Sequence, residues 1–165
     1  ENLEETIYEG YGPNGVAIIV ETLTDNKNRT VAEVRHAFSK YGGSLGTDGS
    51  VAYLFTKVGQ IVVENSDEEK IFDISVSNGA DEVETGDENN LIISVEADEF
   101  HNLKNVLEEQ QIKIDQYELI MKASNSVELD DEASEKVINL LESLEDLDDV
   151  QNVHSNAEFS EGSFA

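Results

Sequence analysis

The alternation of apolar and polar positions over residues 60–122 predicts strands and helices in the order β-α-β-β-α-β. Short apolar, β-branched runs indicate the strands, and apolar residues that recur every three or four positions indicate the helices. The predicted elements are strands that begin at 61 and run over 81–85, 91–95 and 113–122, and helices over 67–78 and 100–107. This order is that of the split βαβ, or ferredoxin-like, fold.

The sequence on either side of this segment predicts a second set of elements. An apolar run over 15–23 indicates a buried strand, and the glycine-rich residues 10–15 are interpreted as a turn that leads into it. Thr30 and Glu33 form a capping-box pattern that predicts the start of a helix, which ends at Gly42-Gly43. The remaining predictions are a strand over 51–58 bounded by a break at Gly59, a helix that begins at 130–132, a strand over 150–154 and a loose tail over 155–165.

Together these elements predict an α+β protein with two ferredoxin-like (split βαβ) domains, the second inserted into the first. The flanks supply β-α-β before the inserted segment and α-β after it, which is most simply explained by one interrupted domain. We therefore expect a discontinuous α/β domain over 1–58 plus 123–165, and an inserted ferredoxin-like domain over 59–122.

Charge restricts where such a protein can meet nucleic acid. The 165 residues contain 10 Lys and Arg and 37 Asp and Glu, a formal net charge of −27. Residues 1–58 hold five of the basic and eight of the acidic residues, so the rest of the chain is far more acidic. Most of the surface should repel phosphate backbones, and residues 25–40 are the best candidate contact. The alternative is that the acidity is only a solvated surface with no partner.

Several motifs resemble catalytic or metal-binding signatures in the wrong context. The G-x-G-x-x-G at 10–15 precedes a strand instead of opening a helix, and the G-x-S-x-G at 42–46 follows a helix. Ser44, Asp48 and His154 therefore have no predicted triad geometry. The three histidines and the acids near 146–149 lack metal-ligand spacing. We expect no catalytic residues, no metal and no cofactor, and hence no enzyme.

The chain contains no cysteine, which excludes disulfides and thiolate chemistry. It has no apolar run near the ~18 residues of a membrane span, and its first residues do not resemble a signal peptide. These features favour a cytoplasmic protein without a membrane partner. Because the sequence begins with Glu1, we expect a fragment or a trimmed chain.

Long blocks of this sequence resemble the YebC/PmpR family. They are YEGYGP at 8–13, TDNKNRTVAEVRH at 24–36 and GTDGSVAYLF at 46–55, followed by NGADEV at 78–83 and LEDLDDVQNV at 144–153. The resemblance covers essentially the whole chain. It implies three domains, of which the last two are α/β with the third inserted in the second, and the first is a basic helical N-terminal domain that is missing from this chain.

The resemblance also implies a function. Members of the family are generally described as probable transcriptional regulators that bind DNA in the cytoplasm. Others are linked to translation and the ribosome, including a mitochondrial translational activator of a cytochrome oxidase subunit. For this chain it implies a non-enzymatic regulator of gene expression, with DNA or ribosomal RNA as partner and with the missing domain needed for full affinity.

The basic residues of the predicted helix form the candidate nucleic-acid contact. Helix N-termini and arginines both suit phosphate groups, so the hypothesis assigns this role to Lys27, Arg29, Arg35, His36 and Lys40. The alternative for Arg29 is that it pairs with Asp25 and only braces the loop. A third class of function is a protein-interaction module, in which the acidic inserted domain binds a basic partner.

Overall fold

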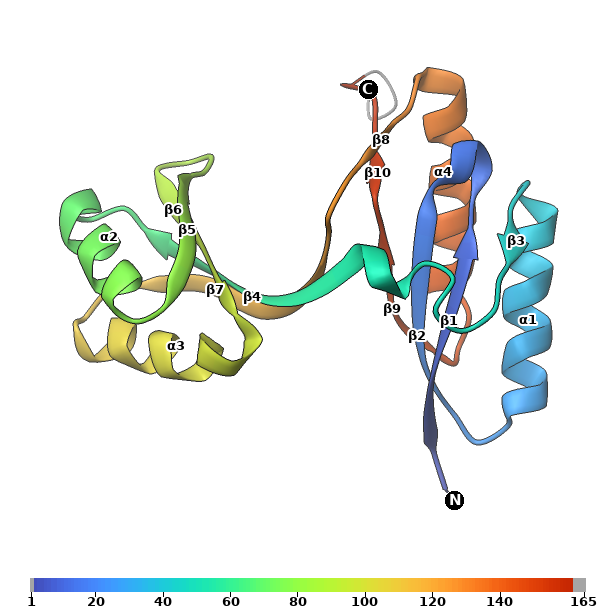
Figure 1. The fold of residues 1–165 in the computed structure, drawn as a ribbon, viewed down its shortest axis with the longest axis horizontal. Helices are drawn as coiled ribbons and strands as arrows, with labels where there is room; N and C mark the ends of the chain where they lie inside the picture. The colour runs from blue at the N-terminus through green and yellow to red at the C-terminus, as the bar shows by residue number, and fades with distance from the viewer. Residues whose placement is uncertain (1, 162–165) are drawn as a thin grey trace. The chain divides into compact units, whose positions relative to one another are not determined.

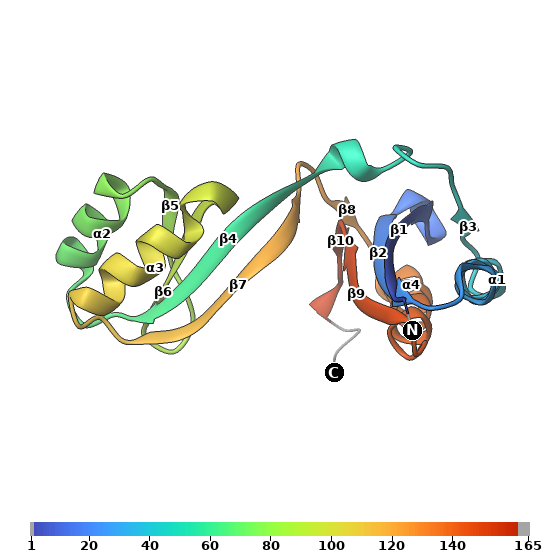
Figure 2. The ribbon, with the colours of Figure 1, turned by 90° about the horizontal axis from the view of Figure 1, so that it is seen from below.

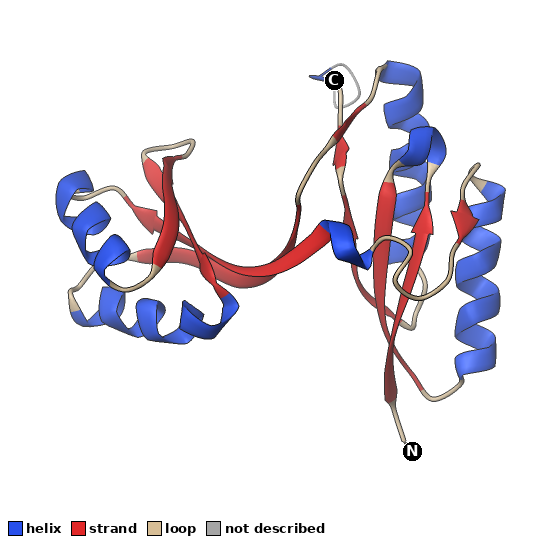
Figure 3. Cartoon of the chain, in the orientation of Figure 1, coloured by secondary structure: helices blue, strands red, loops and turns tan. Residues whose placement is uncertain are grey.

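The computed structural model describes residues 2–161 and divides the chain into two compact units. The discontinuous unit comprises Glu1–Phe55 and Ala123–Ala165, and the inserted unit comprises Thr56–Lys122. Helices and strands are mixed in both (Figure 3), which confirms the predicted α+β class. The domain limits expected from sequence, 1–58 plus 123–165 and 59–122, remain a proposal about which parts fold independently.

The inserted unit has the predicted β-α-β-β-α-β order. Its sheet has the strand order β5-β6-β4-β7, and Figure 2 shows β4 and β7 running alongside each other. This is the strand order of a ferredoxin-like sheet, in which the first and third strands are central. The elements are β4 (Phe55–Glu64), α2 (Glu68–Ser77), β5 (Ala80–Thr85), β6 (Asn90–Glu96), α3 (Phe100–Glu109) and β7 (Ile114–Ala123).

Period-two alternation places the core of the inserted unit on one face of this sheet. In β6 the residues Leu91, Ile93 and Val95 are buried, and the residues between them are partly exposed. They pack with apolar residues of β4 and of both helices, among them Ile61, Ile71 and Leu103. Because a strand presents alternate residues to opposite faces, this pattern fixes which face the helices cover.

Gly59 lies inside β4, so the predicted chain break at this residue is wrong. It pairs with Val95 in the middle of an antiparallel ladder. A Cβ built on Gly59 would clash with the Phe100 ring. Glycine is therefore present because the Phe100 ring occupies the space that a side chain would need, and not because the chain turns.

The discontinuous unit contains a four-stranded sheet of order β3-β1-β2-β9 with two long helices (Figure 1). Apolar residues of α1, α4 and β2 form one core, which includes Ile18, Val34, Phe38 and Leu140. The main elements are β1 (Glu4–Tyr11), β2 (Ala17–Thr24), α1 (Lys27–Lys40), β3 (Ser44–Leu45), α4 (Asp131–Glu145) and β9 (Val150–Ser155). A second, two-stranded sheet pairs β8 (Val127–Glu128) with β10 (Ala157–Glu158) in parallel.

The strand β1 was not predicted from sequence. It forms an antiparallel hairpin with β2, and the turn between them contains Pro13–Gly15. Its exposed acids and its small buried Gly10 remove the apolar alternation that marks a strand. In the sheet, β1 occupies the position that the third strand of a ferredoxin-like fold would take, so the N-terminal segment completes the domain.

Three further predictions in this unit are corrected. Helix α1 begins at Lys27 and is capped by the Asn26 side chain, which accepts the Arg29 N–H at 3.1 Å. Thr30 is thus a buried residue inside the helix and not its cap. The predicted strand over 51–58 begins only at Phe55. The tail expected to be loose contains β10, while its residues 162–165 lie outside the described part.

Replacing Gly59 with Ala should destabilise the inserted unit by about 1–3 kcal/mol, the usual cost of overpacking a filled core. Urea unfolding of the Gly59→Ala variant measures this loss. The exposed neighbour Thr56 gives the control, since Thr56→Ala should change stability by less than about 0.5 kcal/mol. Adding Phe100→Leu should restore part of the loss. Equal stabilities for the two single variants would contradict the steric explanation.

Candidate nucleic-acid interface

Helix α1 differs in charge from the other three α-helices of the described chain. It carries four basic residues, Lys27, Arg29, Arg35 and Lys40, and a single acid, Glu33. Acidic residues outnumber basic ones three to one in α2, two to one in α3 and five to one in α4. The predicted site residues therefore lie on the one helix whose local field favours an anion.

Arg29 is held by two carboxylates. Its Nη2 donates to Asp25 Oδ1 at 3.0 Å and to Asp149 Oδ1 at 2.9 Å, and its Nε donates to Asp149 Oδ2 at 3.2 Å. The Asp149 carboxylate also accepts the Thr30 hydroxyl at 2.7 Å. Asp25 is the partner considered in the bracing alternative, whereas Asp149 lies 120 residues away and was not foreseen.

The electrostatics of this cluster match its geometry. Hydrogen bonds from Arg29 and Thr30 lower the pKa of Asp149 below its ordinary value, against the opposing effect of burial. Hydrogen bonds to Asp149 and then Asp25 raise the pKa of Arg29 further above its ordinary value. Because the planar guanidinium of Arg29 already contacts two carboxylates, its main role is to stabilise the structure and not to bind a ligand. It fixes the start of α1 against the segment before β9.

The other predicted residues are more accessible. Lys27 forms an ion pair with Glu4 at 3.0 Å. Arg35 and His36 are exposed, and no ion pair to either is found within residues 2–161. The Lys40 Nζ lies 5.5 Å from the centre of the Tyr41 ring. Helical spacing places Arg29, His36 and Lys40 along one line of the surface, with Arg35 beside it. The structure thus leaves Arg35, His36 and Lys40 available to a ligand.

The residues of the catalytic-looking motifs are not brought together. Ser44 lies on β3 and His154 on β9, the two opposite edge strands of the sheet. His154 instead contacts Glu21 at 2.8 Å on the neighbouring strand. The G-x-G-x-x-G residues connect the two strands of the β1–β2 hairpin. In the part of the chain that the structure describes, no cluster of three or more His, Asp or Glu side chains is arranged to hold a metal ion.

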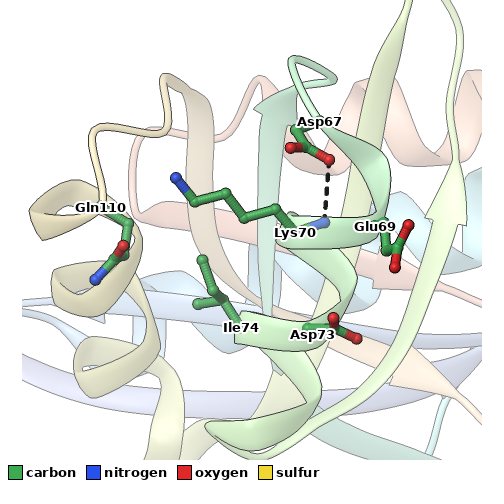
Figure 4. A pocket seen from close by; sticks show the side chains of 6 residues that line it. All are labelled: Asp67, Glu69, Lys70, Asp73, Ile74 and Gln110. Carbon is green, nitrogen blue, oxygen red and sulfur yellow. Dashed lines mark hydrogen bonds between the residues drawn. The ribbon is translucent and has the colours of Figure 1, made fainter.

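A pocket on the inserted unit illustrates how unlike α1 the rest of the surface is. It has a volume of about 480 Å³ and is lined mainly by α2 residues, with Gln110 from the end of α3 on the other side (Figure 4). Its charged lining is three carboxylates, Asp67, Glu69 and Asp73, and one amine, Lys70. The excess of negative charge makes this pocket unsuitable for phosphate.

Glu9 is a buried acid that sequence reasoning did not single out. Its carboxylate accepts the backbone N–H groups of Gly49, Val51 and Ala52 at 2.7, 3.0 and 2.7 Å. Burial by itself raises the pKa of Glu9, but the three backbone hydrogen bonds outweigh it and the pKa is lowered. Glu9 therefore anchors the loop that follows β3 onto β1. It is a structural residue, because its oxygens are occupied.

Comparison with known proteins identifies the family. Residues 3–157 match the family model described as "TACO1/YebC second and third domain". The chain therefore belongs to the TACO1/YebC family, as its resemblance to YebC/PmpR sequences predicted.

Within the described residues, none of the helices is long and apolar enough to cross a membrane.

Over the aligned residues, curated relatives are about half identical to this chain. A probable transcriptional regulatory protein of Legionella pneumophila (strain Lens) is 53% identical over 156 residues, covering 93% of this chain and 62% of the relative. Proteins of the same description from Nitrosococcus oceani and Coxiella burnetii (strain Dugway 5J108-111) are 50% and 51% identical, covering 96% and 98% of this chain. The chain spans 64% and 66% of these two relatives.

A solved structure shows the same fold. The crystal structure of a conserved hypothetical protein, Aq1575 from Aquifex aeolicus, superposes with a TM-score of 0.82 at 43% sequence identity. The match covers 98% of this chain and 67% of that one. The fold of this chain is therefore shared with a homologue whose structure was determined by experiment.

Replacing Asp149 with Asn should destabilise the discontinuous unit by about 1–3 kcal/mol at neutral pH, because buried hydrogen bonds to a charged group are lost. The lowered pKa means that Asp149 contributes stability above the ordinary carboxyl range near pH 4, and that this contribution is lost as the pH falls through its folded-state pKa. The deficit of Asp149→Asn relative to wild type should therefore shrink below about pH 4.

Urea unfolding at a series of pH values measures this deficit. Asp148→Asn removes the same charge from the exposed neighbouring residue and serves as the control. A deficit for Asp149→Asn that stays constant down to pH 3, or one equal to that of Asp148→Asn, would show that the Asp149 carboxylate does not stabilise the fold as its contacts indicate.

Proposed function

We propose that this chain is part of a nucleic-acid-binding regulator of gene expression, and that the exposed face of α1 contacts backbone phosphates. The observation that carries the proposal is the concentration of accessible positive charge on α1 in a chain of net charge −27. The family and the relatives named as probable transcriptional regulatory proteins support the regulatory role. The proposal includes no catalytic step.

The positive charge of α1 can attract phosphate because salt shortens the range of repulsion from the acidic residues elsewhere on the surface. At physiological ionic strength the screening length is about 8 Å, so a phosphate near Arg35 responds chiefly to the charges around it. A helix of 14 residues is about 21 Å long, which is enough to follow several phosphates along one strand. The proposed contacts are therefore local, and they should weaken steeply with added salt.

The five predicted residues take different roles in this proposal. Arg35, His36 and Lys40 form the contact surface, because they are exposed and have no carboxylate partner within residues 2–161. Arg29 orders the loop before α1 through Asp149 and Asp25, and it presents only its remaining exposed edge to a ligand. Lys27 contributes when its exposed ion pair with Glu4 opens, which costs little at the surface.

Duplex DNA is the ligand we propose first, because the relatives are named for transcription. Phosphate contacts position a protein but carry little sequence information. The same surface also suits the backbone of structured RNA. A ribosome-associated translational activator is therefore the alternative, and the binding experiment includes ribosomes to separate the two.

The double variant Arg35→Gln, Lys40→Gln should bind duplex DNA more weakly than wild type, and to a similar degree for unrelated sequences. The slope of log K against log salt should fall by about 2, or about 1 for each phosphate contact removed. Fluorescence anisotropy with labelled duplexes at several salt concentrations measures both quantities. The same titrations are carried out with purified ribosomes.

The control is Lys113→Gln, Lys122→Gln, which removes one positive charge just before β7 and one within it. Both lysines are exposed and pair loosely with Glu64 and Glu82 at 3.9 and 3.6 Å. The control should retain the wild-type salt slope. If the control loses as much slope as the α1 variant, the effect is one of net charge and the assigned interface is wrong. Capture by ribosomes without duplex binding would replace DNA by ribosomal RNA as the partner.

The inserted unit favours a second, protein-binding role. Residues 56–122 contain 17 acidic and five basic residues, and two apolar side chains one helical turn apart on α2, Phe72 and Val76, are 49% and 50% exposed. Exposed apolar groups surrounded by acids suit a basic protein partner better than a nucleic acid. Such binding would be lost at high salt and unaffected by the α1 substitutions.

A further inference from the structure

A second pocket lies on the discontinuous unit, where three segments far apart in the sequence meet. It is formed by the turn between β1 and β2, the end of α1 and the middle of α4. Its volume is about 530 Å³, which is within the range of small-molecule sites. The lining residues are Pro13, Asn14, Lys40, Tyr41, Gly42, Lys136 and Asn139.

The charge of this lining is opposite to that of the chain. It contains two lysines and no carboxylate, although acids outnumber bases 37 to 10 in the sequence. The pocket on α2 has three acids and one lysine, and a pocket on the open face of the sheet has two acids, Glu5 and Glu21, and no base. A smaller pocket beside Asn14 has two acids and one lysine. Among these four, only the Lys40–Lys136 pocket should attract an anion.

Neither lysine is neutralised by a buried acid. The Lys40 Nζ lies over the Tyr41 ring at 5.5 Å, a cation–π arrangement that leaves its donors available. Lys136 pairs with Glu132 at 3.6 Å, and both side chains are largely exposed. A surface pair of this kind is weak, so a phosphate that approaches both lysines can displace Glu132.

The uncharged lining suits a ring system. Asn14 and Asn139 carry amides that both donate and accept hydrogen bonds, as the edges of nucleobases require. Tyr41 and Pro13 supply ring surfaces, and stacking of a base on an aromatic side chain contributes substantially to binding. A simple inorganic anion would use the lysines and leave these groups and most of the volume unused.

We propose that this pocket binds one nucleotide, with its phosphate between Lys40 and Lys136 and its base against Tyr41 and Pro13. Because Lys40 also belongs to the α1 contact surface, the inference rests on the proposed function in its structured-RNA form: the nucleotide is an unpaired residue of a strand that follows α1. A free nucleoside monophosphate has the same chemistry and is the other source. Lys136 and Asn139 lie on α4, outside the α1 surface, so they test the pocket separately.

The experiment is an NMR titration of the ¹⁵N-labelled chain, which follows the Gly42 backbone amide and the Asn14 and Asn139 side-chain amides. The probes are adenosine and uridine monophosphate, adenosine, inorganic phosphate, a single-stranded oligouridylate and a duplex DNA. We expect the monophosphates and the oligouridylate to shift all three signals. Removing one charged phosphate contact should weaken binding about tenfold in Lys136→Gln.

Two further variants make the test specific. Lys70→Gln removes the same charge from the α2 pocket and should leave the affinity unchanged. Glu132→Gln removes the carboxylate that competes for Lys136 and should strengthen binding severalfold. If the phosphate sensed only the net charge of the chain, Lys70→Gln and Lys136→Gln would weaken binding to the same degree, and the pocket would be rejected.

The probes also separate the sources of the ligand. Tighter binding of the oligouridylate than of the monophosphates supports an unpaired nucleotide in a strand, and the reverse supports a free nucleotide. Inorganic phosphate that binds as tightly as the nucleotides, or adenosine that binds as tightly as its monophosphate, overturns the proposal. Arg35→Gln separates the two proposals, because Arg35 lies on the α1 surface and does not line the pocket. It should weaken duplex binding, while the monophosphates should still shift the three amides. Either proposal can therefore fail while the other stands.

Discussion

The contact between Arg29 and Asp149 is the interaction on which the discontinuous unit depends. It joins residues 120 positions apart, on either side of the inserted unit, with Thr30 and Asp25 completing the cluster. A buried carboxylate is costly unless its hydrogen bonds are satisfied, and here Arg29 and Thr30 satisfy them. The start of α1, and with it the direction of its exposed basic face, is set by an acid near the end of the chain.

Periodicity predicted the inserted unit well because its two central strands, β4 and β6, bury alternate residues on one face of the sheet. The discontinuous unit was harder. In β1 the side of the strand toward the helices contains Tyr8 and Gly10, and the Phe38 ring lies where a larger residue 10 would be. A strand whose packing depends on the absence of a side chain has no apolar alternation to detect. The capping-box pattern at Thr30 gave the wrong helix start because the Thr30 hydroxyl donates to the carboxylate of Asp149, which is far away in the sequence.

Sequence identified which residues of α1 are positively charged but not which are accessible. Arg29 and Arg35 are the same residue type and lie six positions apart on one helix. Yet Arg29 is held by two carboxylates, whereas Arg35 is exposed. The difference depends on Asp149, whose position follows only from the fold. The pocket between the β1–β2 turn, α1 and α4 was also beyond sequence, because its lysines are 96 positions apart and neither belongs to a recognisable motif.

The strand order of the discontinuous unit has a consequence for how the protein is made. Its central strand β2 pairs with β1 on one side and with β9 on the other. During synthesis from the N-terminus, the ribosome releases β9 and α4 only after the whole inserted unit. Until then β2 has an unpaired edge and the apolar face of α1 lacks α4, a state prone to wrong association. The dense negative charge of the segment synthesised in between would help keep such nascent chains apart.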